Sequence, residues 1–254
     1  MLRRLALAAT FVMSISPLAA AQSAPGTAAQ KPAEPQAPAA APAAKPPAVE
    51  KLGPNLLRIG TIRVDTAAKE ITVAGKVNPD VRTLEFIANA RDGVKAYETA
   101  VTLDTDAITF NAALLLIGID RSRSKNIPTR HFDTAVPVGD VVEIWLDCPK
   151  KECQRFPAER LMYDMESKAA VAKGTWVYTG STFLSDGRYL AEVDGALIGF
   201  VHDPASIIEY AAGAGLNRYG TIVLNPTLGL KAGSEISLTV KAVRPAAQGG
   251  EPKR

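Results

Sequence analysis

Residues 174–204 read GTWVYTGSTFLSDGRYLAEVDGALIGFVHDP, and no other stretch of the chain carries so many strand signals. Its aromatic and aliphatic runs are short, and Asp-Gly pairs at 186–187 and 194–195 separate them. Apolar runs divided by Asp-Gly pairs are the strongest short-range signal of a β-hairpin. We therefore expect a three-strand meander that Asp203-Pro204 ends. Its strands are expected at residues 175–180, 189–194 and 196–202.

Further runs outside this stretch alternate apolar and polar residues, which is the period of a half-buried strand. One hairpin is expected within residues 56–77, and residues 84–90 and 96–103 are expected to form a second around Asp92-Gly93. Further strands are expected within residues 136–146 and at 160–165, and residues 219–226 lead into a closing strand at 235–243.

Two segments are predicted to be helical. Residues 106–119 (DAITFNAALLLIGI) are apolar on nearly every side, which indicates a buried helix; Asp104 or Asp106 can cap its start and Gly118 its end. Residues 204–212 predict a short second helix, with Asp203 as its cap. The expected fold is therefore α+β and β-rich, an antiparallel sandwich or partly open barrel with the first helix buried against it.

The N-terminus has the order of a secretory signal peptide. Two arginines precede an apolar run at residues 5–15, and three alanines end at Ala21. The apolar run is shorter than the roughly 20 residues of a spanning helix. We expect cleavage after Ala21, a periplasmic or secreted protein, and no stable membrane span afterwards. Retention of the segment as a membrane anchor is the alternative.

Composition divides the rest of the chain. Residues 22–49 hold seven prolines and eleven alanines, so they predict a disordered tether, and residues 246–254 a short disordered tail. The folded domain is then 50–245, which carries 23 basic and 24 acidic side chains. So balanced a charge gives no electrostatic reason to expect nucleic acid as a partner.

The two cysteines, Cys148 and Cys153, lie in the sequence CPKKEC. In an exported protein this pair predicts a local disulfide that braces a loop. A reactive or metal-binding pair is the alternative, although the spacing differs from the two-residue spacing of redox and zinc motifs.

The histidines are the main candidates for chemistry, because the familiar hydrolase, zinc-protease and phosphate-loop motifs are absent from the sequence. His202 and Asp203, with His131, Asp186 or Asp194, could bind a metal or move protons. Against this, the aspartates are explained by turns and caps, and His202 by the end of a strand. We expect no cofactor and no metal.

A charge-biased loop and an aromatic pair are weaker candidates for binding. The basic side chains of residues 120–131 could attract an anion, or could simply complement the end of the preceding helix. Trp176 and Tyr178 face the same side of a strand and could form a platform for a ligand such as a sugar, or could belong to the core. Ser181 lies beside them.

The order of motifs resembles the YdjY-type domain family. AALLLIGI is followed by VPVGDVVEIW, then WVYTGS, GALIGFVHDP, Asn-Pro-Thr and a final Lys-Ala-Gly strand. The resemblance covers about residues 53–243, and WVYTGS and His-Asp-Pro are its most specific parts. It implies an exported bacterial domain, and it carries over neither an activity nor catalytic residues. The sequence has no cysteine-rich iron–sulfur signature, so a redox role is not implied.

The leading functional hypothesis is an exported, non-enzymatic binding or assembly module for an unknown protein or small ligand of the cell envelope. Its surface is expected at Trp176, Tyr178, Ser181, Arg188, His202 and Asp203. The alternative is a hydrolase or metal-dependent enzyme that uses His202 and Asp203 with His131.

Overall fold

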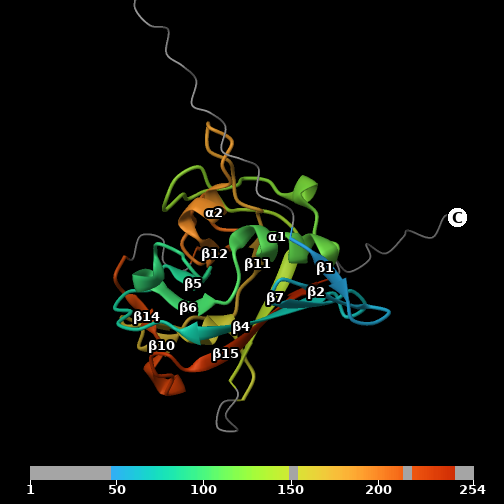
Figure 1. The fold of residues 1–254 in the computed structure, drawn as a ribbon. Helices are drawn as coiled ribbons and strands as arrows, with labels where there is room; N and C mark the ends of the chain where they lie inside the picture. Colours follow the sequence, from blue (N-terminus) through green and yellow to red (C-terminus); the bar gives the residue numbers. More distant parts are fainter. Residues whose placement is uncertain (1–46, 149–153, 214–218, 244–254) are drawn as a thin grey trace, which may run out of the picture. The chain divides into compact units, whose positions relative to one another are not determined.

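The structure, a computed structural model, describes residues 47–148, 154–213 and 219–243 (Figure 1). By its internal contacts the chain divides into Met1–Pro38 and Ala39–Arg254, and every described residue belongs to the second unit. The predicted signal peptide, most of the tether and the tail lie outside the described residues.

The described residues form fifteen strands, two α-helices and four short 3-10 helices. The strands are β1 (Val49–Lys51), β2 (Leu56–Ile59), β3 (Ile62–Asp65), β4 (Glu70–Val77), β5 (Phe86–Asn89), β6 (Thr99–Leu103), β7 (Val141–Asp147), β8 (Phe156–Pro157), β9 (Met162–Asp164), β10 (Ala169–Ala170), β11 (Trp176–Tyr178), β12 (Ala196–Gly199), β13 (Ile208–Tyr210), β14 (Ile222–Leu224) and β15 (Glu235–Ala242). The helices are α1 (Ala107–Leu116), α2 (Leu190–Asp194), η1 (Ala96–Glu98), η2 (Arg121–Arg123), η3 (Ala158–Leu161) and η4 (Pro226–Leu228).

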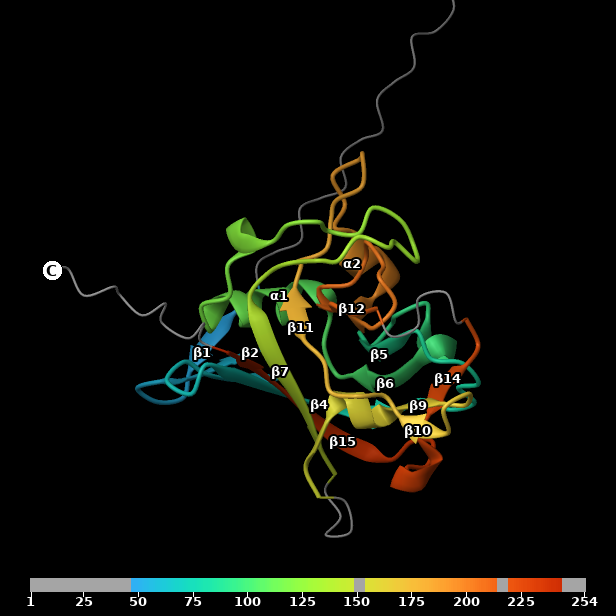
Figure 2. The same cartoon turned by 180° about the vertical axis from the view of Figure 1, so that it is seen from behind.

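Eight strands close into a barrel in the order β4-β15-β7-β11-β13-β12-β5-β6, and β6 pairs back onto β4. The pairs β12–β13 and β5–β6 are parallel and the other six are antiparallel, so the barrel is mixed. Strands β1 to β3 extend the sheet from β4, and β10, β9 and β14 form a separate small sheet (Figures 1 and 2). The predicted β-rich α+β class is confirmed, and the barrel is closed.

The core follows from alternation along the long strands. On β7 the buried side chains are Val142, Ile144 and Leu146, and β15 pairs with β7 so that its own alternate residues are buried too. Helix α1 packs on β3, β4, β12 and α2. Asp106 caps this helix as predicted, because its Oδ1 accepts a bond of 2.6 Å from Thr109 N.

The predicted second helix at 204–212 is wrong. Residues Ile208–Tyr210 form the buried strand β13 between β11 and β12, and residues 203–206 form a turn. A short apolar run that is buried on both faces has no period to tell a helix from a strand.

The predicted meander and the second hairpin are also wrong. Residues Leu190–Asp194 form α2 and not a strand, and Gly195, at φ 71°, caps that helix. Strand β11 pairs with β7 and β13, while β12 pairs with β5 and β13. Strands β5 and β6 lie parallel, because η1 follows Asp92-Gly93 and returns the chain to the start of β5. Asp194-Gly195 is a helix end, which uses the same left-handed glycine as a hairpin, and Asp92-Gly93 lies in a loop.

Barrel closure requires close contact at Gly75. Strand β4 pairs with β15 along its length and with β6 only at residues 75–77. A Cβ on Gly75 would lie 2.6 Å from Thr102 O and 2.9 Å from Leu103 Cδ2. Only glycine therefore lets β6 approach β4 at the closing pair.

We predict that Gly75→Ala lowers the free energy of unfolding by roughly 1–3 kcal/mol, because the new methyl group must push β6 away. Urea denaturation measures the change. Gly53→Ala is the control, since its Cβ would meet only Leu56 Cβ at 3.7 Å, an ordinary contact. Equal stability of the two variants would contradict the assigned role of Gly75.

Candidate functional site

Backbone pairing at one part of the barrel brings buried carboxylates together. Phe200 N donates to Glu85 O at 3.1 Å, which lays the chain after β12 beside the start of β5 and brings Asp203 near Glu85. Glu85 N donates to Glu98 O at 2.9 Å, which adds the end of η1. Glu85 and Asp203 are buried, with side chains 3% and 4% exposed. Such carboxylates need cationic or hydrogen-bonding partners.

His131 supplies the first of those partners. It lies in the loop between η2 and β7, and its Nδ1 is 2.7 Å from Asp203 Oδ2 while its Nε2 is 3.1 Å from Glu85 Oε2. Both ring nitrogens thus face carboxylate oxygens, which only accept hydrogen bonds. The hydrogen bond with Asp203, and then that with Glu85, raises the pKa of His131 to about 9 despite partial burial. At neutral pH the ring is an imidazolium ion.

Lys95 supplies the second cation. Its Nζ lies 2.9 Å from Asp203 Oδ2 and 4.8 Å from the centre of the Phe86 ring. Burial alone would lower the pKa of Lys95, but the bond and charge of Asp203 outweigh burial and raise it. Burial alone would likewise raise the pKa of Asp203, yet His131 and Lys95 lower it to about 2. We call Glu85, Lys95, Glu98, His131 and Asp203 the ion cluster.

Glu98, the last member of the ion cluster, and Glu209 of β13 border these ion pairs. Burial, and then the neighbouring Glu85 carboxylate, raises the pKa of Glu98. Glu209 on β13 is fully buried, which raises its pKa well above the usual range. Its Oε1 accepts from Asp203 N at 3.1 Å, and its Oε2 has no hydrogen-bond partner among the residues the structure describes. Burial thus favours the neutral form of Glu209, and its side chain holds the backbone of Asp203.

His202 is directed away from the ion cluster. Its Nδ1 lies 2.8 Å from Asp133 O and its Nε2 3.1 Å from Tyr210 O, and the residue is fully buried. Of the three residues in the predicted enzyme site, the structure brings His131 and Asp203 into contact and places the His202 ring among backbone carbonyls. No histidine nitrogen is open to a substrate in this arrangement.

The predicted aromatic platform is not a surface. Trp176 and Tyr178 are 2% and 1% exposed; Trp176 packs edge-on against Tyr210, and Tyr178 donates to Asn111 Oδ1 at 2.7 Å. Both belong to the core. Ser181 is buried as well, with its Oγ bonded to Pro204 O at 3.0 Å.

The remaining predicted binding groups pair with the protein itself. Arg188 is exposed, and its Nε lies 2.7 Å from Asp186 Oδ2. In the charge-biased loop, Arg123 pairs with Asp140 and Asp120, and Arg121 donates to Ser181 O at 2.7 Å. These bonds satisfy the two arginines of η2 within the domain.

Sequence reasoning missed Glu85, Lys95, Glu98 and Glu209. Only two of them left a readable signal: Glu85 and Glu209 each interrupt an apolar run, in LEFI and SIIEYA. A charged residue inside a buried strand is rare unless it is paired, so such an interruption marks a buried polar site. Nothing local marks Lys95 or Glu98.

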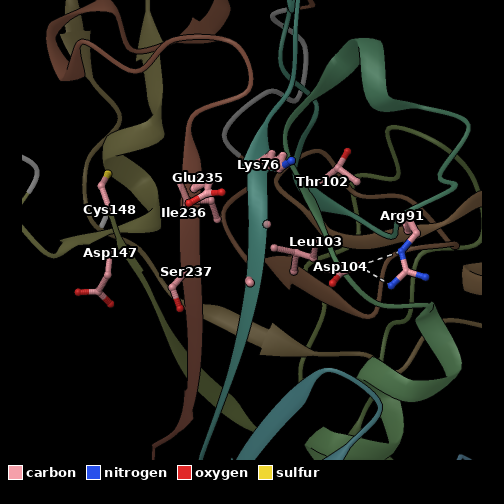
Figure 3. Close-up of a pocket in the computed structure, with 12 residues that line it drawn as sticks. Lys76, Arg91, Thr102, Leu103, Asp104, Asp147, Cys148, Glu235, Ile236 and Ser237 are labelled. Atoms are coloured by element: carbon pink, nitrogen blue, oxygen red, sulfur yellow. Dashed lines mark hydrogen bonds and ion pairs between the residues drawn. The ribbon is translucent and has the colours of Figure 1, made fainter. Parts of the chain in front are cut away.

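A hollow lies elsewhere on the barrel. Its volume is about 730 Å³, and strands β4, β15 and β6 line it with the end of β7. Its lining is mostly apolar, although Ile236 and Leu103 are almost fully buried, and Lys76, Glu235 and Asp147 contribute charges. Figure 3 shows β4 passing between the β15 residues on one side and Leu103, Asp104 and Arg91 on the other. No member of the ion cluster lines this hollow.

Within residues 47–148, 154–213 and 219–243, no three or more His, Cys, Asp or Glu side chains are arranged to hold a metal ion. No helix in these ranges is long and apolar enough to cross a membrane. Cys153 lies outside the described residues, so the disulfide with Cys148 stays a prediction.

The fold and site define a mixed β-barrel domain with a buried ion cluster and a separate surface hollow. The family model for the YdjY domain matches residues 62–215, which is more than half of the chain. The chain therefore belongs to the YdjY domain family, as its motifs indicated. No curated protein matches the chain, and no solved structure matches it.

We predict that His131→Gln removes a pH-dependent part of the stability. Because the folded pKa of His131, about 9, lies above its usual 6.5, the wild-type advantage is complete below pH 6.5 and disappears as pH rises through 9. Allowing for solvent screening of a side chain that is 38% exposed, the advantage is roughly 1–2 kcal/mol.

Urea unfolding of both proteins at intervals between pH 6 and 10 measures this difference. Arg130→Gln, on the neighbouring exposed residue, controls for the loss of a positive charge in the loop. If the difference in unfolding free energy between wild type and His131→Gln stays constant from pH 6 to 10, folded His131 does not hold its proton up to a raised pKa, and the assignment is contradicted.

Proposed function

We propose that this protein is an exported, non-enzymatic binding or assembly module of the cell envelope, and that the hollow beside β4 and β15 holds its ligand. The hollow carries the proposal, because ligand sites are concave and combine apolar walls with a few polar groups. Its lining is mostly apolar and includes the exposed Ala74, and Lys76 and Glu235 are cross-strand partners at its edge. Such a lining suits a ligand with an apolar body and polar or charged ends.

Export rests on the sequence of residues 1–21, and the tether of residues 22–49 would give the domain reach within the envelope. The lack of an open histidine nitrogen supports a binding role over catalysis. His131 is held by two carboxylates and His202 by two carbonyls, so neither is placed to accept a proton from a bound substrate.

A single surface substitution can block the hollow without changing a core residue. Ala74 is exposed, lines the hollow and lies opposite Ser237 on β15. We predict that Ala74→Arg abolishes capture of the ligand or partner from native envelope extract, because the long side chain occupies the hollow. The measurement is quantitative mass spectrometry of protein and small molecules retained by the purified full chain.

Ala170→Arg on β10 is the matched control, since this exposed alanine does not line the hollow. It should retain what the wild type retains. Retention of the same species by all three proteins would overturn the assignment of the hollow.

A hydrolase or metal-dependent enzyme is the second candidate, and one contact favours it, the 2.7 Å pair of His131 and Asp203. Its test is a screen of the wild type against ester, amide, glycoside and phosphate substrates, with and without added divalent metals. Turnover that His131→Gln loses and Ala74→Arg keeps would replace the binding proposal. The absence of turnover, together with capture that depends on Ala74, would support it.

A further inference from the structure

Both histidines of the chain tie one loop to the barrel. The loop runs from residue 126 to 137 between η2 and β7, and Figures 1 and 2 show it as the yellow-green segment that passes above α2. Lys125 and Val138 close its neck with two backbone hydrogen bonds of 2.8 and 3.0 Å. A compact loop of this length with joined ends is an Ω-loop, a class of loop that is often functional.

The tip of the loop is internally organised. Asp133 Oδ2 accepts from Thr129 N and Thr129 Oγ1, each at 3.0 Å, and Asp133 Oδ1 accepts from Ala135 N at 3.1 Å. Phe132 adopts a positive φ of 55°, an unfavourable conformation for a bulky residue. The tip is therefore a preformed unit that meets the barrel at a few points.

The loop contacts the rest of the domain through both histidines and through apolar residues. His131, from the loop, reaches Glu85 and Asp203 of the barrel, while His202, from the barrel, reaches the Asp133 carbonyl of the loop. Phe132 packs edge-on against Tyr219 with ring centres 6.1 Å apart, and Pro128 and Pro137 near the two ends of the loop are buried. Glu85, Asp203 and His202 thus lie against the loop and are almost fully buried.

We propose that the loop at residues 126–137 is a hinged cover that His131 holds closed, and that loss of the proton on His131 opens it and exposes Glu85, His202 and Asp203. Without that proton the ring can donate to only one carboxylate, and the second nitrogen then faces an acceptor oxygen. Two buried carboxylates would share Lys95 alone, which favours their return to water.

The charges around His131 set the direction of this switch. The groups that face or border it from the packed elements and from its own loop are Glu85, Lys95, Glu98, Arg130, Asp133, Asp194, Asp203, Glu209 and Tyr219. The two carboxylates that contact the ring keep it protonated, so the cover is closed at neutral pH and opens on the alkaline side. This inference does not depend on the proposed binding hollow, which shares no residue with the cover.

Hydrogen–deuterium exchange of the purified full chain tests the proposal. Exchange is followed for residues 203–206, because the amides of Asp203, Ala205 and Ser206 donate to Glu209 Oε1, Asp203 Oδ1 and Asp203 O beneath the cover. It is measured at pH 6.5 and pH 10 and corrected for the intrinsic pH dependence of amide exchange. We expect protection at pH 6.5 and, at pH 10, corrected rates that are about tenfold higher or more in this segment. Strands β4 and β15 should keep their protection, which distinguishes local opening from unfolding.

Three variants make the test specific. His131→Gln should leave residues 203–206 unprotected at both values of pH, and His131→Arg should keep them protected at both because its charge does not titrate. Arg130→Gln should behave as wild type. Equal corrected protection in the wild type at pH 6.5 and 10 would overturn the proposal. So would simultaneous loss of protection in β4 and β15, or wild-type behaviour of His131→Gln.

Discussion

Burial of Glu85 and Asp203 is the constraint on which the rest of this part of the domain depends. A carboxylate taken out of water costs several kcal/mol unless cations and hydrogen bonds replace its hydration. Here His131 and Lys95 do so, from a loop and from the start of a 3-10 helix that are distant in sequence. One electrostatic requirement thereby fixes the positions of β5, η1, the end of β12 and the loop at 126–137.

The same requirement explains why the histidines are poor catalytic groups in this structure. A general base must hold an available lone pair near neutral pH, and the two carboxylates keep the His131 ring protonated. His202 is turned towards two carbonyls. The binding that we propose lies on another part of the barrel, where Gly75 lets β6 close on β4 and the surface beside this junction is hollow.

Local signals predicted the elements whose sequence has a clear period or cap. The helix at 107–116 has its Asp106 cap, and β7 and β15 alternate along their length. The topology could not be predicted from such signals. Asp194-Gly195 ends a helix here, because a left-handed glycine serves helix ends as well as hairpins, and Asp92-Gly93 lies in the connection that joins parallel strands through η1.

The site was predicted only in part, and for a physical reason. His131 and Asp203 were named as partners and are in contact, but Glu85 and Lys95 join them through strand pairing that no local pattern encodes. Trp176 and Tyr178 alternate as a surface pair would, yet β11 lies between β7 and β13 and buries both residues. Whether such a strand faces solvent depends on its neighbours, which are set by the topology.

The protonation state of His131 decides this account most directly. With only two histidines in the chain, a nitrogen–proton correlation spectrum of the imidazole rings, assigned with His131→Gln, is simple to interpret. The account predicts that both ring nitrogens of His131 carry protons at pH 7.5 and that the ring titrates with a midpoint near 9. A bare ring nitrogen on His131 at pH 7.5, with a midpoint near the ordinary value of about 6.5, would contradict it.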